Sequence, residues 1–193
     1  MKPQKSKKNV KDTRLYSIYS RGLLSRNVVI PITGIGKNIE ETIENSVKNE
    51  YEGKCSEEGY VRPHSIKIIT HSSGRIDRGN MVQFDVVFEC DICFPVEGML
   101  IACTAVTITE AGIRAISTSD NPTPIMVFLA KEHHYNDEYF SSVKEGDSVT
   151  IRVIGQRFEL NDKWISIIAE LVKPKQVSMD TTKNRPLLVI EKD

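Results

Sequence analysis

The stretch VQFDVVFECDICFPVEG, residues 82–98, carries the most regular pattern in the chain. Apolar residues occupy every second position from Val82 to Phe94, and most positions between them are polar. Because side chains alternate between the two faces of a β-strand, this pattern predicts a long strand with one buried face. Pro95 and Gly98 then interrupt the strand, and shorter β patterns follow.

Two cysteines of this strand, Cys90 and Cys93, form a Cys-x-x-Cys motif of the kind that binds zinc elsewhere. In a continuous strand the two sulfur atoms point to opposite faces, whereas a metal ion needs both on one side. The remaining cysteines, Cys55 and Cys103, form no second motif. We therefore expect small core cysteines, no metal site and no disulfide scaffold, which suits a reducing compartment.

The sequence after Gly98 predicts a small all-β barrel. Five segments have the character of short strands: residues 99–109, 113–117, 125–130, 148–158 and 164–171. A short helix at residues 136–143 and a Lys-Glu-Gly-Asp turn precede the fourth of them. Five strands with a small helix before the fourth are typical of an oligonucleotide/oligosaccharide-binding (OB) barrel.

The residues before the long strand predict an α+β arrangement. Apolar segments at residues 24–32 and 60–70 predict strands, and the polar segment 71–80 predicts a hairpin loop. Between the two strands, apolar residues recur at every fourth position, namely Ile35, Ile39, Ile43 and Val47. This spacing predicts an amphipathic helix, with a capping box formed by Asn38 and Glu41 and an end near Gly53.

The loop between the first strand and this helix resembles a phosphate-binding loop in its order of elements. It consists of Pro31, Ile32, Thr33, Gly34, Ile35, Gly36 and Lys37. A phosphate-binding loop needs a glycine where Pro31 stands and a Ser or Thr where Asn38 stands. We therefore expect no nucleotide and no other cofactor. A nucleotide-dependent enzyme would instead be protected by ATP or GTP against thermal unfolding.

Bulk properties describe an ordinary globular chain of one large or two small domains. It has 193 residues, 39% of them hydrophobic and 27% charged. No apolar run is long enough to span a membrane, and no secretory signal is recognisable, so we expect an intracellular protein without membrane contact. The adjacent residues His133 and His134 point in different directions near a strand end, which favours exposed polar side chains over a metal site.

Charge is distributed unevenly although the net charge is zero. Residues 1–14 carry six Lys or Arg against one Asp, which predicts a disordered basic tail. Residues 91–172 carry six Lys or Arg against twelve Asp or Glu, a balance of −6 that disfavours strong nucleic-acid binding. Residues 173–193 form a C-terminal tail with one apolar patch, Leu187–Ile190. Disorder and docking both remain open for this tail.

Several short motifs of the predicted barrel resemble an S1-type OB domain. They are Gly98, Gly112, Met126–Lys131, Gly146-Asp147 and Ile165–Ile168. The preceding half narrows the resemblance. Its elements are, in order, a strand, a proline-glycine loop, a helix, Glu52–Cys55, a hairpin and the alternating strand, after which Phe94–Gly98 lead into the barrel. In this order of elements, the preceding half resembles the stalk subunit of DNA-dependent RNA polymerases. This is the family of the seventh subunit of eukaryotic RNA polymerase II and of its archaeal counterpart.

The resemblance covers residues 15–172 and implies two domains. Residues 15–95 would be an α+β tip domain that docks on the polymerase core, and residues 96–172 would be an S1-like OB barrel near the exiting transcript. The implied partners are the largest core subunits, a small clamp-adjacent subunit and, in many family members, a small helical stalk partner. The implied docking residues are Pro31, Ile32, Thr33, Gly34, Ile35, Gly36, Lys37, Arg75 and Arg78, with segment 71–80 beside the loop.

Contact with nascent RNA is expected to be weak and salt-sensitive, because the barrel is acidic and its second strand lacks aromatic residues for base stacking. Phe128 fits core and surface equally well. The candidate RNA-binding residues are Lys131, Arg114, Arg152, Arg157 and Lys163.

No set of residues in the sequence assembles into a catalytic site, so the expected role is that of a non-catalytic accessory subunit. The alternative is a free-standing S1/OB RNA-binding factor in translation or RNA decay, which would bind RNA through the isolated barrel. As a polymerase subunit the chain would act in the nucleus. If it is virus-encoded, as its Ile/Lys/Asn-rich composition allows, it would act in a cytoplasmic viral factory or virion.

Overall fold

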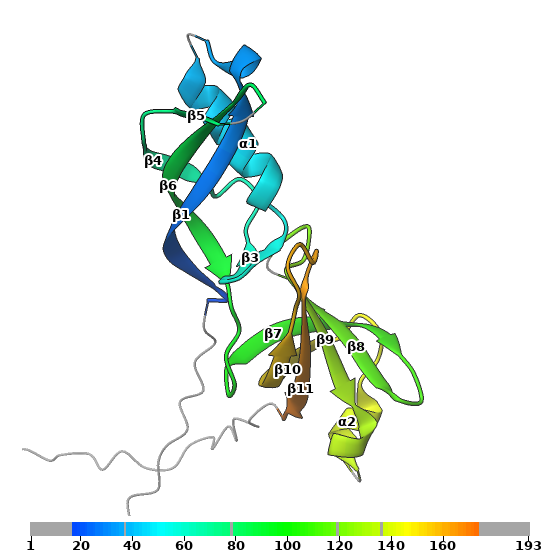
Figure 1. Cartoon of the computed structure of the whole chain (residues 1–193). Coiled ribbons are helices and arrows are strands. Elements are labelled where there is room, and N and C mark those ends of the chain that lie inside the picture. Colours follow the sequence, from blue (N-terminus) through cyan, green and yellow to red (C-terminus); the bar gives the residue numbers. More distant parts are fainter. Residues whose placement is uncertain (1–16, 37, 78, 119, 136, 174–193) are drawn as a thin grey trace, which may run out of the picture.

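The structure is a computed structural model that describes residues 17–36, 38–77, 79–118, 120–135 and 137–173 (Figure 1). The predicted basic tail and the C-terminal tail after Lys173 lie outside these residues. The fold is mostly β, with few helices. A six-stranded sheet with one long helix, here called the sheet lobe, is followed by a closed five-stranded barrel.

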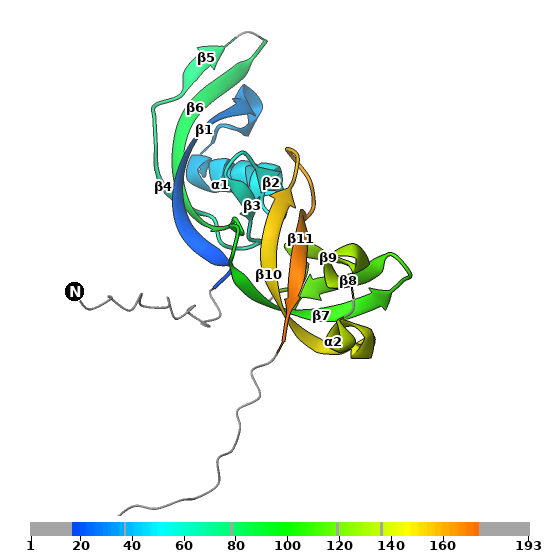
Figure 2. The same cartoon turned by 90° about the horizontal axis from the view of Figure 1, so that it is seen from below.

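The sheet lobe consists of β1 (Tyr19–Pro31), the 3-10 turn η1 (Ile32–Gly34), α1 (Ile39–Tyr51), β2 (Cys55–Ser56), β3 (Gly59–Val61), β4 (Lys67–His71), β5 (Arg75–Asp77) and β6 (Met81–Cys93). The long strand β6 organises it. On one side β6 pairs with β1 along its whole length, and on the other side it pairs with β3, β4 and β5, all antiparallel. Figure 2 shows α1 against the concave side of the curved sheet.

The alternation predicted for β6 is confirmed. Every second side chain from Val82 to Ile92 is buried and packs with Ile43 and Val47 of α1 in one core. Cys90 belongs to this core, whereas Cys93 on the other face belongs to the core of the barrel. The two sulfur atoms therefore point apart, as the strand period requires.

Four local predictions for this lobe are wrong. The first strand begins at Tyr19 rather than at residue 24, because Tyr19–Leu23 pair with the end of β6. Segment 60–70 is two strands, because Pro63 lacks an N–H and His64 has a positive φ of 60°. Segment 71–80 is not all loop, since it contains β5.

The fourth wrong prediction concerns the start of the helix. Asn38 is the N-cap residue, but its side chain makes no bond to the backbone; its amide donates to Glu41 Oε2 at 3.3 Å instead of forming a capping box. Ile35 lies before the helix and is exposed. The predicted helix end is confirmed, since α1 stops at Tyr51 and Gly53 has a φ of +71°.

The barrel consists of β7 (Leu100–Ile108), β8 (Gly112–Ser117), β9 (Ile125–Ala130), the 3-10 turn η2 (Lys131–His134), α2 (Glu138–Ser142), β10 (Ser148–Arg157) and β11 (Ile165–Val172). The strands close in the order β7-β8-β9-β11-β10-β7, and β9 and β11 are the parallel pair. All five predicted strands are present, with ends shifted by at most one residue. This closed barrel is consistent with an OB-like fold.

The prediction of two exposed histidines is wrong for His134, which is buried. Its Nε2 accepts a hydrogen bond from the Leu171 N–H at 2.8 Å, so Nδ1 carries the proton and donates to the Ala130 carbonyl at 2.8 Å. The ring also stacks on Phe140 of α2 with the ring centroids 4.5 Å apart. His134 therefore ties η2 and α2 to the last strand.

We expect His134→Ala to lower the free energy of unfolding by about 2–4 kcal/mol, because it leaves the buried Leu171 N–H without an acceptor and opens a cavity. The neighbouring variant His133→Ala is the control, and its effect should stay within about 0.5 kcal/mol because His133 is exposed. Urea denaturation followed by circular dichroism measures both. Equal effects of the two variants would contradict the structural role of His134.

The two parts of the molecule share a core. Ile18, Cys55, Tyr60 and Cys93 from the sheet lobe pack into the barrel cluster. Two backbone hydrogen bonds join β2 to the β10–β11 loop: the Cys55 N–H donates to the Asp162 carbonyl at 2.8 Å, and the Asn161 N–H donates to the Cys55 carbonyl at 2.9 Å. The sheet lobe is therefore attached to the barrel by packing and by main-chain contacts.

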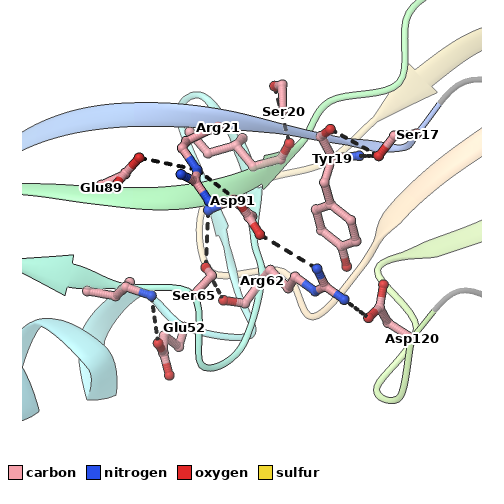
Figure 3. A network of polar contacts seen from close by, with 12 residues as sticks. Ser17, Tyr19, Ser20, Arg21, Glu52, Arg62, Ser65, Glu89, Asp91 and Asp120 are labelled. Atoms are coloured by element: carbon pink, nitrogen blue, oxygen red, sulfur yellow. Dashed lines mark hydrogen bonds and ion pairs between the residues drawn. The ribbon is translucent and has the colours of Figure 1, made fainter.

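A polar network reinforces this junction (Figure 3). The Arg62 guanidinium donates to Asp120 of the barrel at 2.6 Å, lies 3.6 Å from Asp91 of β6, and sits over the Tyr19 ring at 4.8 Å. The Tyr19 hydroxyl is buried and points toward Asp120. Burial, together with the Asp120 carboxylate, holds the pKa of Tyr19 far above its ordinary value. The hydroxyl therefore stays neutral throughout the physiological pH range.

Candidate functional site

The predicted docking loop lies at the end of the sheet lobe that is farthest from the barrel (Figure 1). β1 ends at Pro31, and η1 turns the chain toward α1. The Ile32 N–H donates to the Asn80 carbonyl at 2.8 Å, which fixes this loop beside the β5–β6 hairpin. The expected neighbourhood of the two segments is thus present in the structure.

Three isoleucines at this end are exposed. Ile32 is 45% exposed, Ile35 is 38% exposed, and Ile76 on β5 is 80% exposed. We call Ile32, Ile35 and Ile76 the tip patch. Ile32 and Ile35 belong to the loop and Ile76 to the neighbouring hairpin, and exposed apolar side chains gathered at one end of a domain are typical of contact surfaces.

The remaining predicted docking residues differ in what surrounds them. Thr33 is exposed in η1. Gly34 and Gly36 have no positive φ, so the loop does not use the left-handed glycine conformations that curl backbone N–H groups around an anion. Arg75 forms an ion pair with Asp85 across β5 and β6, and both side chains are exposed. Lys37 and Arg78 lie outside the described residues.

A second candidate surface is a groove on the outside of the barrel with a volume of about 440 Å³. Strand register builds it, because Arg114 on β8 lies opposite Phe128 on β9, Phe128 opposite Ile168 on β11, and Ile168 opposite Gly155 on β10. Phe128 and Ile168 are 40% and 50% exposed. Gly155 has no side chain, and an added Cβ there would meet open space. We call this surface the outer groove.

Two of the five predicted RNA-binding residues line the outer groove. The Arg114 guanidinium rests on the Met126 thioether, with nitrogen–sulfur distances of 3.1 and 2.7 Å. Arg157 pairs with Glu159 at 3.2 Å, and both are strongly exposed. Among the described residues, Arg114 has no carboxylate partner. The groove therefore combines an apolar floor with two positive charges.

The other three predicted RNA-binding residues lie elsewhere. Arg152 pairs with Glu170 at 2.5 Å, toward the opposite end of β10. Lys131 is exposed at the start of η2. Lys163 is exposed in the β10–β11 loop, next to the segment that binds Cys55 of the sheet lobe. The structure thus does not gather the five cations into one site.

Sequence reasoning missed two features of these surfaces and one of the junction between the sheet lobe and the barrel. Ile76 falls in the segment predicted as a hairpin loop but lies on β5, and an isoleucine between two charged residues is a signal for an exposed strand position. Phe128 is a surface residue, and only the β8 and β11 neighbours that enclose it give it a role. The hydrogen bond from Arg62 to Asp120 joins residues 58 positions apart in the sequence, and no local sequence pattern predicts it.

The four cysteines are free and buried. Burial raises the pKa of Cys90 to about 11 and of Cys55, Cys93 and Cys103 to about 12. Thiols with such values are poor nucleophiles and poor metal ligands near neutral pH. Within the described ranges, no group of three or more His, Cys, Asp or Glu side chains is arranged to hold a metal ion.

No helix of the described chain is both long and apolar enough to cross a membrane.

Comparison with known proteins gives a similarity to a viral protein. No protein-family model matches the chain. The chain is similar to "Putative DNA-directed RNA polymerase subunit L376" of Acanthamoeba polyphaga mimivirus, with 25% identity over 172 residues that cover 81% of this chain and 83% of that protein. Neither the sheet lobe nor the barrel alone amounts to 81% of the chain. The similarity therefore extends over residues of both.

Proposed function

We propose that this chain is a non-catalytic stalk subunit of a DNA-dependent RNA polymerase. The observation that carries the proposal is the similarity to the mimivirus polymerase subunit, which supports a role in a DNA-directed RNA polymerase and includes both parts of the chain. The order of sheet, helix and OB-like barrel supports the stalk position within such an enzyme. The chain would assist initiation and transcript handling while other subunits perform nucleotide addition.

In this proposal residues 15–95 form the docking domain and residues 96–172 form the barrel domain. The docking loop 31–37 and the tip patch contact the polymerase core, which means the largest subunits and a small subunit near the clamp. Apolar anchors surrounded by polar residues suit such a contact, because a few buried side chains supply most of the binding free energy of an interface. Lys37, Arg75 and Arg78 would add charge pairs that orient the docking.

The barrel would lie close to the exiting transcript and contact it weakly. Arg114 and Arg157 at the outer groove, with Lys131, Arg152 and Lys163 around the barrel, supply the positive charge. The acidic balance of the barrel limits the affinity. Because the polymerase holds the transcript nearby, a high effective concentration makes weak contacts sufficient.

The similarity to a viral protein favours a viral or nuclear location for the assembly, such as a cytoplasmic viral factory, a virion or the nucleus. A small helical stalk partner that packs across the junction of sheet lobe and barrel would complete the assembly.

A free-standing S1/OB RNA-binding factor is the second candidate function. The outer groove favours it, because an exposed aromatic ring between two arginines is suited to a stacked base. This candidate predicts measurable RNA affinity of the chain without any polymerase.

Gentle affinity purification of the tagged full-length chain from its native source, followed by mass spectrometry, separates the two candidates. The stalk proposal predicts recovery of the two largest RNA polymerase subunits. Recovery of ribosomes, RNA-decay factors or RNA alone would overturn the stalk proposal and support the free-standing factor.

A further inference from the structure

The most apolar segment outside the described residues, Leu187–Ile190, has no role in the proposed function. It belongs to residues 174–193, which the structure does not describe. We propose that Leu187–Ile190 binds in the outer groove of the barrel of the same molecule. The contact itself is independent of the polymerase assignment.

The groove is chemically suited to an extended aliphatic segment. Its floor is formed by Met126, Phe128 and Ile168, which are apolar and accessible. Gly155 leaves the side toward β10 open, since no heavy atom lies within 4 Å of the position that a Cβ would occupy. In an extended segment alternate side chains face the same way, so two of the four residues would face the floor. Covering this surface removes apolar area from water, which stabilises the contact.

The length of the tail permits this contact. The described chain ends at Lys173, directly after β11, and 13 residues separate it from Leu187. An extended chain of that length spans roughly 40 Å. Ile168 in the groove lies only four residues before Val172 on β11, which corresponds to about 13 Å. Because the segment is tethered, its effective concentration near the groove is high, and modest contacts suffice to hold it.

Charge favours this occupant. Glu191 follows the apolar segment directly, and Lys192 and Asp193 come after it. The barrel is acidic overall, but the groove carries two arginines. Arg114 has no carboxylate partner among the described residues, and the exposed ion pair of Arg157 contributes little to the free energy of folding. The Glu191 carboxylate, which adjoins the apolar segment, would therefore find charge-assisted hydrogen bonds at this part of the barrel surface.

One consequence does rest on the proposed function. The bound tail would cover Arg114 and Arg157, two of the five residues proposed to contact RNA. The tail and the transcript would then compete for the groove, so that RNA contact requires displacement of the chain's own segment.

Intramolecular disulfide trapping in the full-length chain tests the inference. The variant Ser166→Cys/Leu188→Cys places one thiol in the groove and one in the segment, and Ser166 is exposed there. The control variant Ser141→Cys/Leu188→Cys places the first thiol on α2. That helix lies near the end of the described chain, since Lys173 pairs with Asp137, its N-cap residue, at 3.1 Å. The four native cysteines are buried and stay silent.

We expect mild oxidation at low protein concentration to give about tenfold more of the 166–188 disulfide than of the 141–188 disulfide, as read by peptide mass spectrometry. Adding Gly155→Leu, which fills the groove, or Ile190→Asp, which leaves the described residues unchanged, should reduce the yield about fivefold. Equal yields from the two pairs, disulfides only between molecules, or yields insensitive to both additions would overturn the inference. Failure to copurify with a polymerase would leave it intact.

Discussion

Gly59→Ala is expected to destabilise the protein by about 3 kcal/mol or more. Gly59 opens β3 with a φ of +130°, a conformation that L-residues with a side chain rarely adopt. A Cβ on this residue would lie 2.4 Å from the Cys93 carbonyl oxygen, which belongs to the backbone of β6 and cannot move aside alone. The strand would have to leave the sheet.

The loss would reach beyond the strand. Tyr60, the next residue, pairs with Cys93 and packs into the barrel cluster, while Cys55 on β2 carries the backbone bonds to the barrel loop. Displacing β3 therefore loosens the junction between sheet lobe and barrel.

Urea denaturation measures this prediction, and the midpoint should fall by about 1–2 M. Gly36→Ala is the matched control, because its Cβ would meet open space and its φ is not positive. Its effect should stay within about 0.5 kcal/mol. A Gly59→Ala protein as stable as the Gly36→Ala protein would contradict the pairing of β3 with β6.

The double variant Ile32→Asn/Ile76→Asn is expected to lose its association with the polymerase core about tenfold or more. Both side chains are exposed, so the substitutions leave the fold of the free chain nearly unchanged, with a stability effect within about 0.5 kcal/mol. In the proposed complex the two residues would be buried, and polar side chains there would lose apolar contact and bring unsatisfied amides into the interface.

The measurement compares the amount of the large polymerase subunits recovered with equal amounts of each tagged chain. Leu23→Asn is the control, because Leu23 on β1 is 66% exposed but lies toward the opposite end of the strand from the tip patch. It should recover the subunits as well as the natural chain does. An equal loss for Leu23→Asn would assign the effect to general surface change rather than to the tip patch.

The sequence predicts the barrel strands well for a physical reason. Each strand is a short segment rich in apolar residues, and glycine, proline or polar turns separate the strands, so local signals and the closed barrel agree. The long strand β6 is equally clear, because its buried face continues without a break from Val82 to Ile92.

Elements without such a local signal are mispredicted. Tyr19–Leu23 of β1 contain polar and basic residues and a glycine, yet they pair with the end of β6, where Gly22 leaves room for Ile92. β5 has three exposed residues and exists because β6 extends far enough to pair with it. Tertiary pairing decides both cases, and a single-sequence pattern does not contain that information.

The candidate surfaces show the same limit. The docking loop is continuous in sequence and could be proposed from its proline, glycines and isoleucines. The outer groove combines residues of four strands, and the parallel pairing of β9 with β11 is what brings Phe128 beside Ile168. A basic residue such as Arg152 looks equivalent to Arg157 in the sequence, but its pairing with Glu170 places it elsewhere.

The most direct test of the central claim places a photo-crosslinking amino acid at position 76 in the purified native assembly. The stalk proposal predicts crosslinks from this position, on β5, to a core subunit of an RNA polymerase. It predicts none from position 23, which lies on β1 away from the tip patch. Crosslinks from position 76 to ribosomal or RNA-decay proteins, or none to any polymerase subunit while the chain is present in the assembly, would contradict docking through the tip patch.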